Sequence, residues 1–154
     1  FQDLIEQALA IYRPTLEQGG CEIVEQYDGD LEGLCDRHQV LQILVNLVSN
    51  AKNAMEAIPD KPHRLTLHVG AAPDRPGFVR FEIIDTGMGI VSGHLSRLFT
   101  QRFTSRSDGH GIGLHSAALA AKNLGGTLQA KSEGPGQGAT FVLELPLNPI
   151  EVPT

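Results

Sequence analysis

Four separated blocks of this chain carry residues whose types and spacing could do chemistry. The first is polar, and the other three are rich in glycine. In chain order they read Asn46-Leu-Val-Ser-Asn50-Ala, Asp85-Thr-Gly87-Met-Gly89-Ile, Gly109-His-Gly111-Ile-Gly113-Leu and Gly136-Gln-Gly138-Ala-Thr140-Phe. Each glycine block alone is a weak signal. Together they supply a carboxylate for a base, an amide for a metal and a glycine-rich loop for phosphates, which are the parts of an ATP pocket.

The first block lies on a helix expected over residues 37–58, with Asp36 as its N-cap and Pro59 at its end. At about 100° per residue, one narrow stripe of this helix carries neutral amides and no charge. It consists of Gln39, Gln42, Asn46, Asn50 and Asn53. A solvated face would normally use Lys and Glu, which are better helix formers than Asn. The stripe is therefore either a ligand-binding face, suited to Mg²⁺ through its amide oxygens, or merely polar.

The second block places Asp85 at the end of an expected strand, followed by glycines that permit close backbone approach. An ionised Asp only accepts hydrogen bonds, so it could take the amino hydrogens of adenine. Guanine presents an oxygen there and would be rejected. An ordinary turn is the alternative interpretation, because Asp-x-Gly is common at strand ends.

The third block opens a helix expected over residues 111–124, where loop N–H groups and the helix N-terminus could bind phosphate. No strand leads directly into it, and no Gly-Lys-Ser/Thr ends it, which excludes a dinucleotide fingerprint and a P-loop. Upstream, Arg102 and Arg106 could reach a phosphate or could be ordinary surface arginines.

Regular elements must position these blocks. Helical spacing begins at Phe1 and is stopped by Gly19-Gly20, and alternation predicts strands over residues 21–27, 31–35, 64–70, 78–84, 127–131 and 139–145. Between Asp85 and Gly109 no regular element is expected, and a loop of about 20 residues is usually functional or disordered. The prediction is an α/β (α+β) two-layer sandwich, with three helices on a sheet of about five or more strands.

Size and composition fit one globular domain of 154 residues, 41% of them hydrophobic. No run approaches the roughly 18 apolar residues of a membrane helix, so we expect no membrane insertion of this segment. A net charge of −6 without a basic cluster argues against nucleic-acid binding. Cys21 and Cys35 form no C-x-x-C pair, which indicates thiols in a reducing cytoplasm. Because the chain begins inside a helical pattern, we expect a fragment of a longer protein.

The order of the blocks resembles the catalytic ATP-binding domain of two-component sensor histidine kinases, in the gyrase-like Bergerat-fold (GHKL) superfamily. The first block resembles the N box, the second the G1 box, and the third the G2 box. Leu98-Phe99-x-x-Arg102-Phe103-Thr-Ser-Arg106 resembles the F box, and the fourth block the final glycine segment. The resemblance covers essentially the whole chain. It implies a single domain over residues 1–154, with a mixed sheet, a mobile ATP lid, and ATP and Mg²⁺ as cofactors.

The resemblance also implies roles. Asn50 would coordinate Mg²⁺, with Asn46 supporting it, and Asp85 would hold the adenine amino group with Gly87 against the ring. Arg106 takes the place of a basic residue that can reach phosphate, and would be catalytic together with Asn46 and Asn50. Further nucleotide contacts would come from Asn53, Gly89, Gly109, His110, Gly111, Ile112, Gly113 and Leu114.

Three positions depart from the family pattern. Arg102 stands where an aromatic residue is often found, Asn53 where many members carry a basic residue, and His110 where a small hydroxyl residue is commoner.

One position discriminates between transfer and hydrolysis. Hydrolytic members resemble one another in carrying Glu four residues before the metal asparagine; here that residue is Asn46, which cannot act as a general base. None of the six histidines is followed by an acidic residue, so the phosphoacceptor is expected on a separate helical dimerisation domain. A response regulator would act downstream, and the isolated chain should not label itself. A related protein-serine (anti-sigma-type) kinase, a non-catalytic nucleotide-binding scaffold and a gyrase-type ATPase remain as alternatives.

Overall fold

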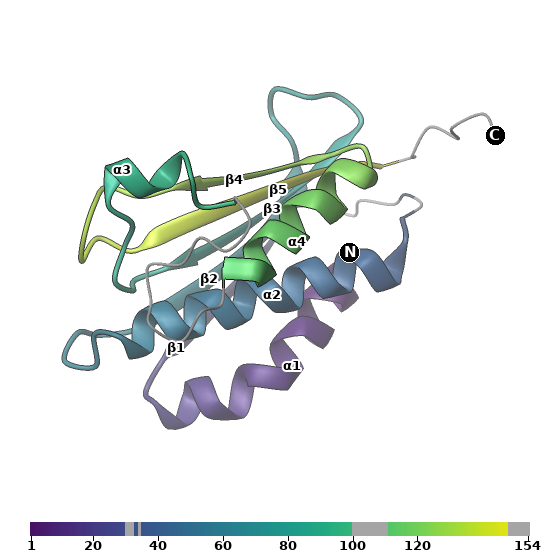
Figure 1. Ribbon diagram of the computed structural model, residues 1–154. Coiled ribbons are helices and arrows are strands. Elements are labelled where there is room, and N and C mark those ends of the chain that lie inside the picture. Colours follow the sequence, from purple (N-terminus) through teal and green to yellow (C-terminus); the bar gives the residue numbers. More distant parts are fainter. Residues whose placement is uncertain (30–32, 34, 100–110, 148–154) are drawn as a thin grey trace.

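A computed structural model of the protein describes residues 1–29, 33, 35–99 and 111–147 (Figure 1). Two long helices and a strand come first, and most of the sheet follows. In chain order the elements are α1 (Gln2–Gln18), β1 (Glu22–Tyr27), α2 (Arg37–Glu56), β2 (Arg64–Ala71), β3 (Phe78–Asp85), α3 (Ser92–Leu95), α4 (Gly111–Asn123), β4 (Thr127–Lys131) and β5 (Ala139–Pro146).

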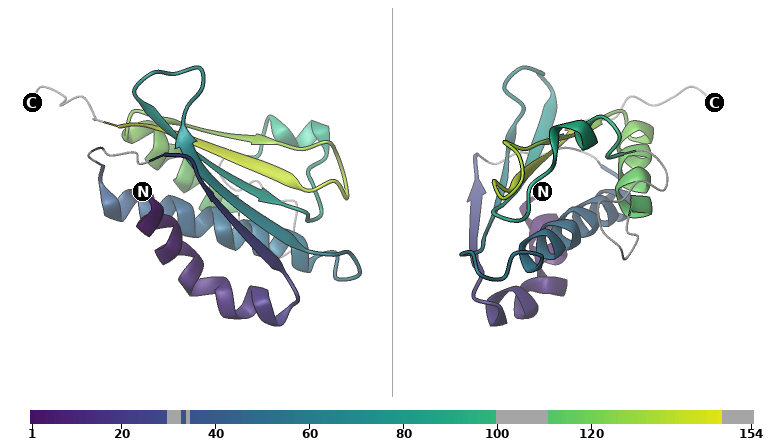
Figure 2. Two further views of the ribbon diagram at one scale, coloured as in Figure 1. Left: turned by 180° about the vertical axis from the view of Figure 1, so that it is seen from behind. Right: turned by 60° about the vertical axis from the view of Figure 1, so that its left-hand side comes forward.

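The five strands form one mixed sheet in the order β1-β2-β3-β5-β4. β1 runs parallel to β2, whereas the other neighbouring pairs are antiparallel. Helices α1, α2 and α4 lie on one face of the sheet, and the opposite face has no helix among the described residues (Figure 2). The predicted fold class, a two-layer sandwich of three helices on a mixed sheet, is confirmed. None of the helices in the described ranges is long and apolar enough to cross a membrane.

Helix α2 is the central element of the helical layer. The Asp36 carboxylate accepts a hydrogen bond from the Gln39 backbone N–H at 3.1 Å, which makes it the predicted N-cap. One side of the helix packs on the inner face of the sheet and is buried at Val40, Ile43, Leu44, Leu47, Val48, Ala51 and Met55. Burying each large apolar side chain contributes about 1.5–3 kcal/mol, so this contact fixes the rotation of α2 and thus the direction of its amide stripe.

The strand expected over residues 31–35 is not found in its described residues, since Gly33 and Cys35 lie in no strand; residues 31, 32 and 34 lie outside the described residues. β1 pairs with β2, and the Asp28 N–H still donates to the Val69 carbonyl at 2.9 Å. The chain then leaves the sheet at Gly29, whose φ is +75°. Gly33 instead lies against the backbone of Leu147 so closely that a Cβ would collide with it.

The segment after β3 contains the short helix α3, which the sequence analysis did not predict. Four residues carry too little periodicity to be recognised. After α3, Leu98 is buried in the core, and the Phe99 ring meets the Phe141 ring edge to face at 6.4 Å. The chain up to Phe99 is therefore anchored to the sheet.

Candidate functional site

Asp85 is the last residue of β3 and is only 3% exposed. Its Oδ1 accepts a hydrogen bond from the Gly87 N–H at 2.8 Å, whereas its buried Oδ2 has no partner among the described residues. Burial raises the pKa of this carboxyl to about 6, although the backbone N–H groups of Gly87 and Ala139 oppose the shift. Buried polar atoms are normally paired, so this oxygen is available to a hydrogen-bond donor of a ligand.

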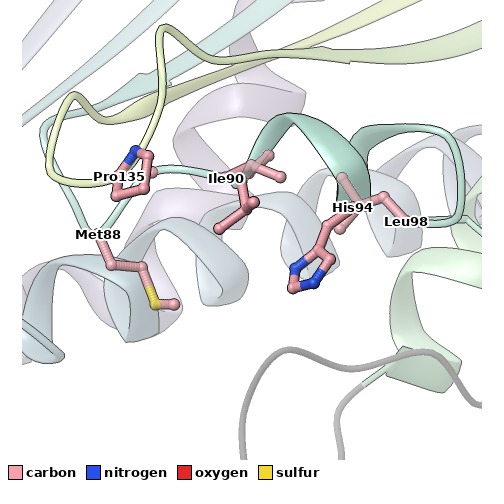
Figure 3. Close-up of a pocket in the computed structure, with 7 residues that line it drawn as sticks. Met88, Ile90, His94, Leu98 and Pro135 are labelled. Atoms are coloured by element: carbon pink, nitrogen blue, oxygen red, sulfur yellow. The ribbon is translucent and has the colours of Figure 1, made fainter.

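A hollow with a mainly apolar lining adjoins the turn that follows Asp85. Figure 3 shows Met88 and Ile90 from the loop after β3, His94 and Leu98 from α3 and the segment behind it, and Pro135 from the β4–β5 turn. Gly89 and Val91 complete the described lining of this hollow, in which His94 is the one polar side chain. Such a surface suits the flat face of a heterocyclic base.

Gly87 allows the loop after β3, called the G1 loop below, to lie directly on the last turn of α2. A Cβ at Gly87 would lie 2.6 Å from the carbonyl carbon of Ala54, and the Met88 N–H donates to the Ala54 carbonyl at 2.9 Å. A side chain at this position would push the loop away from the helix. The structure therefore gives a packing reason for Gly87, and its contact with a base stays a prediction.

The predicted amide stripe divides into two parts. Gln39 is used for capping, because its Nε2 donates to Asp36 Oδ2 at 2.9 Å, and Gln42 is exposed. Asn46 reaches α4 instead, with its Nδ2 at 3.5 Å from the Gly113 carbonyl.

Asn50 and Asn53 are half-buried, and the described part of the chain offers their amides no hydrogen-bond partner. Only the C-terminal half of the stripe thus keeps amides that the described residues leave unpaired. Two contacts flank these amides on α2. Asn46 contacts α4, and Ala54 contacts the G1 loop.

The remaining predicted residues have different outcomes. Arg102, Arg106, Gly109 and His110 lie outside the described residues, as does most of the predicted lid. Gly111, Ile112, Gly113 and Leu114 begin α4, as predicted for the helix after the third block. The Leu114 side chain packs in the core, so only its backbone is left for a nucleotide.

Several residues that line the hollow were not predicted to do so from the sequence: Met88, Ile90, Val91, His94, Leu98 and Pro135. Met88 and Ile90 could have been found from the sequence, because they stand in the same block as Asp85. No local pattern marks His94 or Pro135, since only the fold brings α3 and the β4–β5 turn to the same hollow.

The fold and this site define an ATP-binding domain of the Bergerat type. The chain belongs to the family described as histidine kinase-, DNA gyrase B- and HSP90-like ATPase, whose profile matches residues 35–149. It is 37% identical to the autoinducer 2 sensor kinase/phosphatase LuxQ of Vibrio parahaemolyticus over 96% of this chain and 18% of that protein. It is 35% identical to the two-component sensor PprA of Pseudomonas aeruginosa over 71% of this chain and 12% of that protein.

Solved structures agree. Full-length ShkA in complex with AMPPNP superposes with a TM-score of 0.81 at 29% identity, covering 99% of this chain and 31% of that chain. The catalytic domain of the histidine kinase ThkA superposes with a TM-score of 0.81 at 23% identity, covering 96% and 95% of the two chains. The chain spans only 12% and 18% of the lengths of the two curated relatives named above. The resemblance to the catalytic ATP-binding domain of sensor histidine kinases is confirmed.

Proposed function

We propose that this chain binds Mg·ATP and donates the γ-phosphoryl group to a histidine on a separate helical dimerisation domain of the same protein. The observation that carries the proposal is the buried Oδ2 of Asp85, which has no partner among the described residues, at the start of the loop whose Met88 and Ile90 line an apolar hollow. Adenine offers a flat apolar face and an amino group at one edge, and both find a counterpart here. A guanine oxygen facing Oδ2 would leave two acceptors together.

The asparagines of α2 fit a magnesium site. Mg²⁺ prefers oxygen ligands and usually takes few protein groups besides phosphate oxygens and waters. Asn50 supplies such an oxygen and has no partner among the described residues, with Asn53 on the same side of the helix. When bound, the ion would neutralise phosphate charge. Asn50→Ala is therefore expected to lose mainly the Mg²⁺-dependent part of ATP affinity.

Transfer rather than hydrolysis is supported by Asn46. A carboxylate at this position could activate water, but an amide cannot. The contact between Asn46 and the Gly113 carbonyl instead indicates a role in holding the start of α4 against α2. Catalysis would then rest on positioning and on charge neutralisation, as is usual for phosphoryl transfer. Arg106 and the glycines of the third block remain part of this proposal.

The proposal includes partners beyond this chain. We place residues 1–154 as the single ATP-binding domain of a longer, cytoplasm-facing kinase that releases ADP and passes the phosphoryl group on to a response regulator. Since no histidine here is followed by an acidic residue, the chain alone is expected not to phosphorylate itself.

Phosphoryl transfer to a separately produced partner tests the proposal. The chain is mixed with the dimerisation domain of its own full-length protein and with γ-labelled Mg·ATP, and acid-labile label on the partner is measured. Label on the partner's histidine, and none on this chain alone, is the expected result. Nucleotide binding without any transfer would contradict the kinase proposal. Steady ATP hydrolysis by the chain alone would favour the ATPase alternative.

A further inference from the structure

A serine hydroxyl joins two loops at the nucleotide hollow. Ser132 directly follows β4, and its Oγ accepts hydrogen bonds from the N–H groups of Ile90 at 3.0 Å and Gly134 at 3.2 Å. The same hydroxyl donates to the Gly138 carbonyl at 2.7 Å. The Gly134 carbonyl lies farther from this oxygen, at 3.4 Å. A hydroxyl has one hydrogen and two lone pairs, so the hydrogen goes to the nearer Gly138 carbonyl and the lone pairs accept from the two N–H groups.

The β4–β5 turn that Ser132 opens supports the G1 loop along its length. The Gly136 N–H donates to the Met88 carbonyl at 2.7 Å, and the Gly138 N–H donates to the Gly87 carbonyl at 3.2 Å. Gly89 has a φ of +74° and lies so close to the Gly134 carbonyl that a Cβ would collide with it. The Ser132 side chain adds a hydrogen bond to this backbone contact between the β4–β5 turn and the G1 loop, at Ile90.

Ile90 connects this contact to the hollow, because it lines the hollow while its N–H is held by Ser132. The sheet itself does not depend on the serine, since Asp85 pairs with Ala139 in the β3–β5 ladder. Removing the hydroxyl should therefore loosen the loop at Ile90, while the backbone hydrogen bonds of Met88 and the sheet stay in place.

We propose that Ser132 is a positioning residue for nucleotide recognition. It holds the G1 loop so that Met88 and Ile90 form the wall for the base while Asp85 Oδ2 faces the amino edge. This inference rests on the proposed function, and it adds the β4–β5 turn to the parts of the chain that determine adenine selectivity.

The test compares Ser132→Ala with Ser132→Thr, which keeps the hydroxyl, and with Ser116→Ala, a matched control on the exposed side of α4. Dissociation constants for ATP and GTP are measured by calorimetry, together with the melting temperature. We expect Ser132→Ala to weaken ATP binding about tenfold, because unpaired loop groups lose their fixed geometry. The ATP-to-GTP preference should fall as well. Ser132→Thr should stay close to the parent chain, and Ser116→Ala should be unchanged.

The outcomes separate the two proposals. A parent chain that binds no ATP overturns the proposed function. A parent that binds ATP, with Ser132→Ala keeping the same affinity and the same ATP-to-GTP ratio, overturns the role of Ser132. A lower melting temperature with an unchanged ratio also overturns it, since that is the result of a purely structural contact. If Ser132→Ala does not fold, Ser132→Cys, which donates only weakly, allows the same comparison.

Discussion

Burial makes the Asp85 carboxyl, whose Oδ2 has no partner among the described residues, sensitive to pH. The pKa of Asp85 is raised from 3.8 to about 6 because burial disfavours its charged form. In the free protein, the stability that the neutral form confers is fully present below the ordinary pKa and is lost as the pH rises through about 6. A ligand amino group that donates to Oδ2 would favour the ionised form and pull the pKa back down.

Nucleotide affinity should therefore depend on the ionisation of Asp85. We expect ATP binding to strengthen as the pH rises from about 5 and to level off above about 6, the free-state pKa. Calorimetric titration across this range measures it. Asp85→Asn is the control, because it keeps the titration of the nucleotide phosphates but removes that of the carboxyl. The same pH dependence in both proteins would contradict the assignment of Asp85.

Two glycines in neighbouring segments provide a matched pair of substitutions. Gly87→Ala forces a Cβ to within 2.6 Å of the α2 backbone, whereas a Cβ at Gly93 in α3 meets nothing within 4 Å. Overpacking against backbone costs about 1–3 kcal/mol, so Gly87→Ala should weaken ATP binding by tenfold or more or lower the melting temperature clearly. Gly93→Ala should do neither. Fluorescence titration and thermal unfolding of both variants check this, and equal behaviour would show that the G1 loop is not held on α2.

At the scale of elements, His115 joins α4 to the end of the segment behind α3. Its Nδ1 lies 2.9 Å from the Phe99 carbonyl. A carbonyl oxygen only accepts, so Nδ1 must carry the hydrogen. The His115 side chain therefore donates this hydrogen bond from Nδ1.

The effect of substituting His115 on stability should depend on whether the new side chain can donate this hydrogen bond. The amide nitrogen of Asn can take the place of Nδ1, so His115→Asn should keep most of the stability. His115→Leu should lose about 1 kcal/mol, because the Phe99 carbonyl is left without its donor. Urea unfolding measures both. A Leu variant as stable as the Asn variant would mean that the Phe99 contact contributes nothing.

Elements with strong periodicity could be predicted from the sequence, and contacts between distant segments could not. Helix α2 was expected over residues 37–58 and is found over Arg37–Glu56. It could be predicted because its apolar spacing and the Asp36 cap are local signals. A short apolar run says nothing about its partner, so the strand expected over 31–35 was wrong in its described residues. Asp85 and Gly87 could be recognised as site residues from their types and spacing. Ser132 and His94 could not, because their place at the site depends on which segments the fold brings together.

At the scale of the whole molecule, ion pairs lie on the face of the sheet that carries no helix among the described residues. Glu144 lies on this face and is only 8% exposed. Arg80 Nε donates to it at 2.9 Å and Arg75 at 3.3 Å, while the Arg75 guanidinium lies 3.8 Å from the centre of the Phe78 ring. Arg75, in the β2–β3 loop, thus covers part of this face of the sheet. In a three-layer fold, a second layer of helices would cover it.

A second cluster on that face joins three parts of the sheet. His68 of β2 contacts Asp28, which follows β1, through Nε2, and Glu82 of β3 at 3.2 Å through Nδ1. The hydrogen bond to Asp28 is the largest cause that raises the pKa of His68, with Glu82 adding to it and burial opposing it. Both ring nitrogens can donate at once only in the imidazolium, so the cluster is complete when His68 is charged.

The stability contributed by His68 should fall as the pH rises. Because the folded-state pKa is raised above 6.5, this contribution is fully present below 6.5 and is lost as the pH passes through the folded-state value. His68→Gln is therefore expected to destabilise the protein more at about pH 6 than at about pH 8, measured by urea unfolding at both values. In a background that carries Asp28→Asn and Glu82→Gln, the same substitution should have no pH-dependent effect. An equal loss at both pH values in the parent chain would mean that His68 packs in this cluster without its charge.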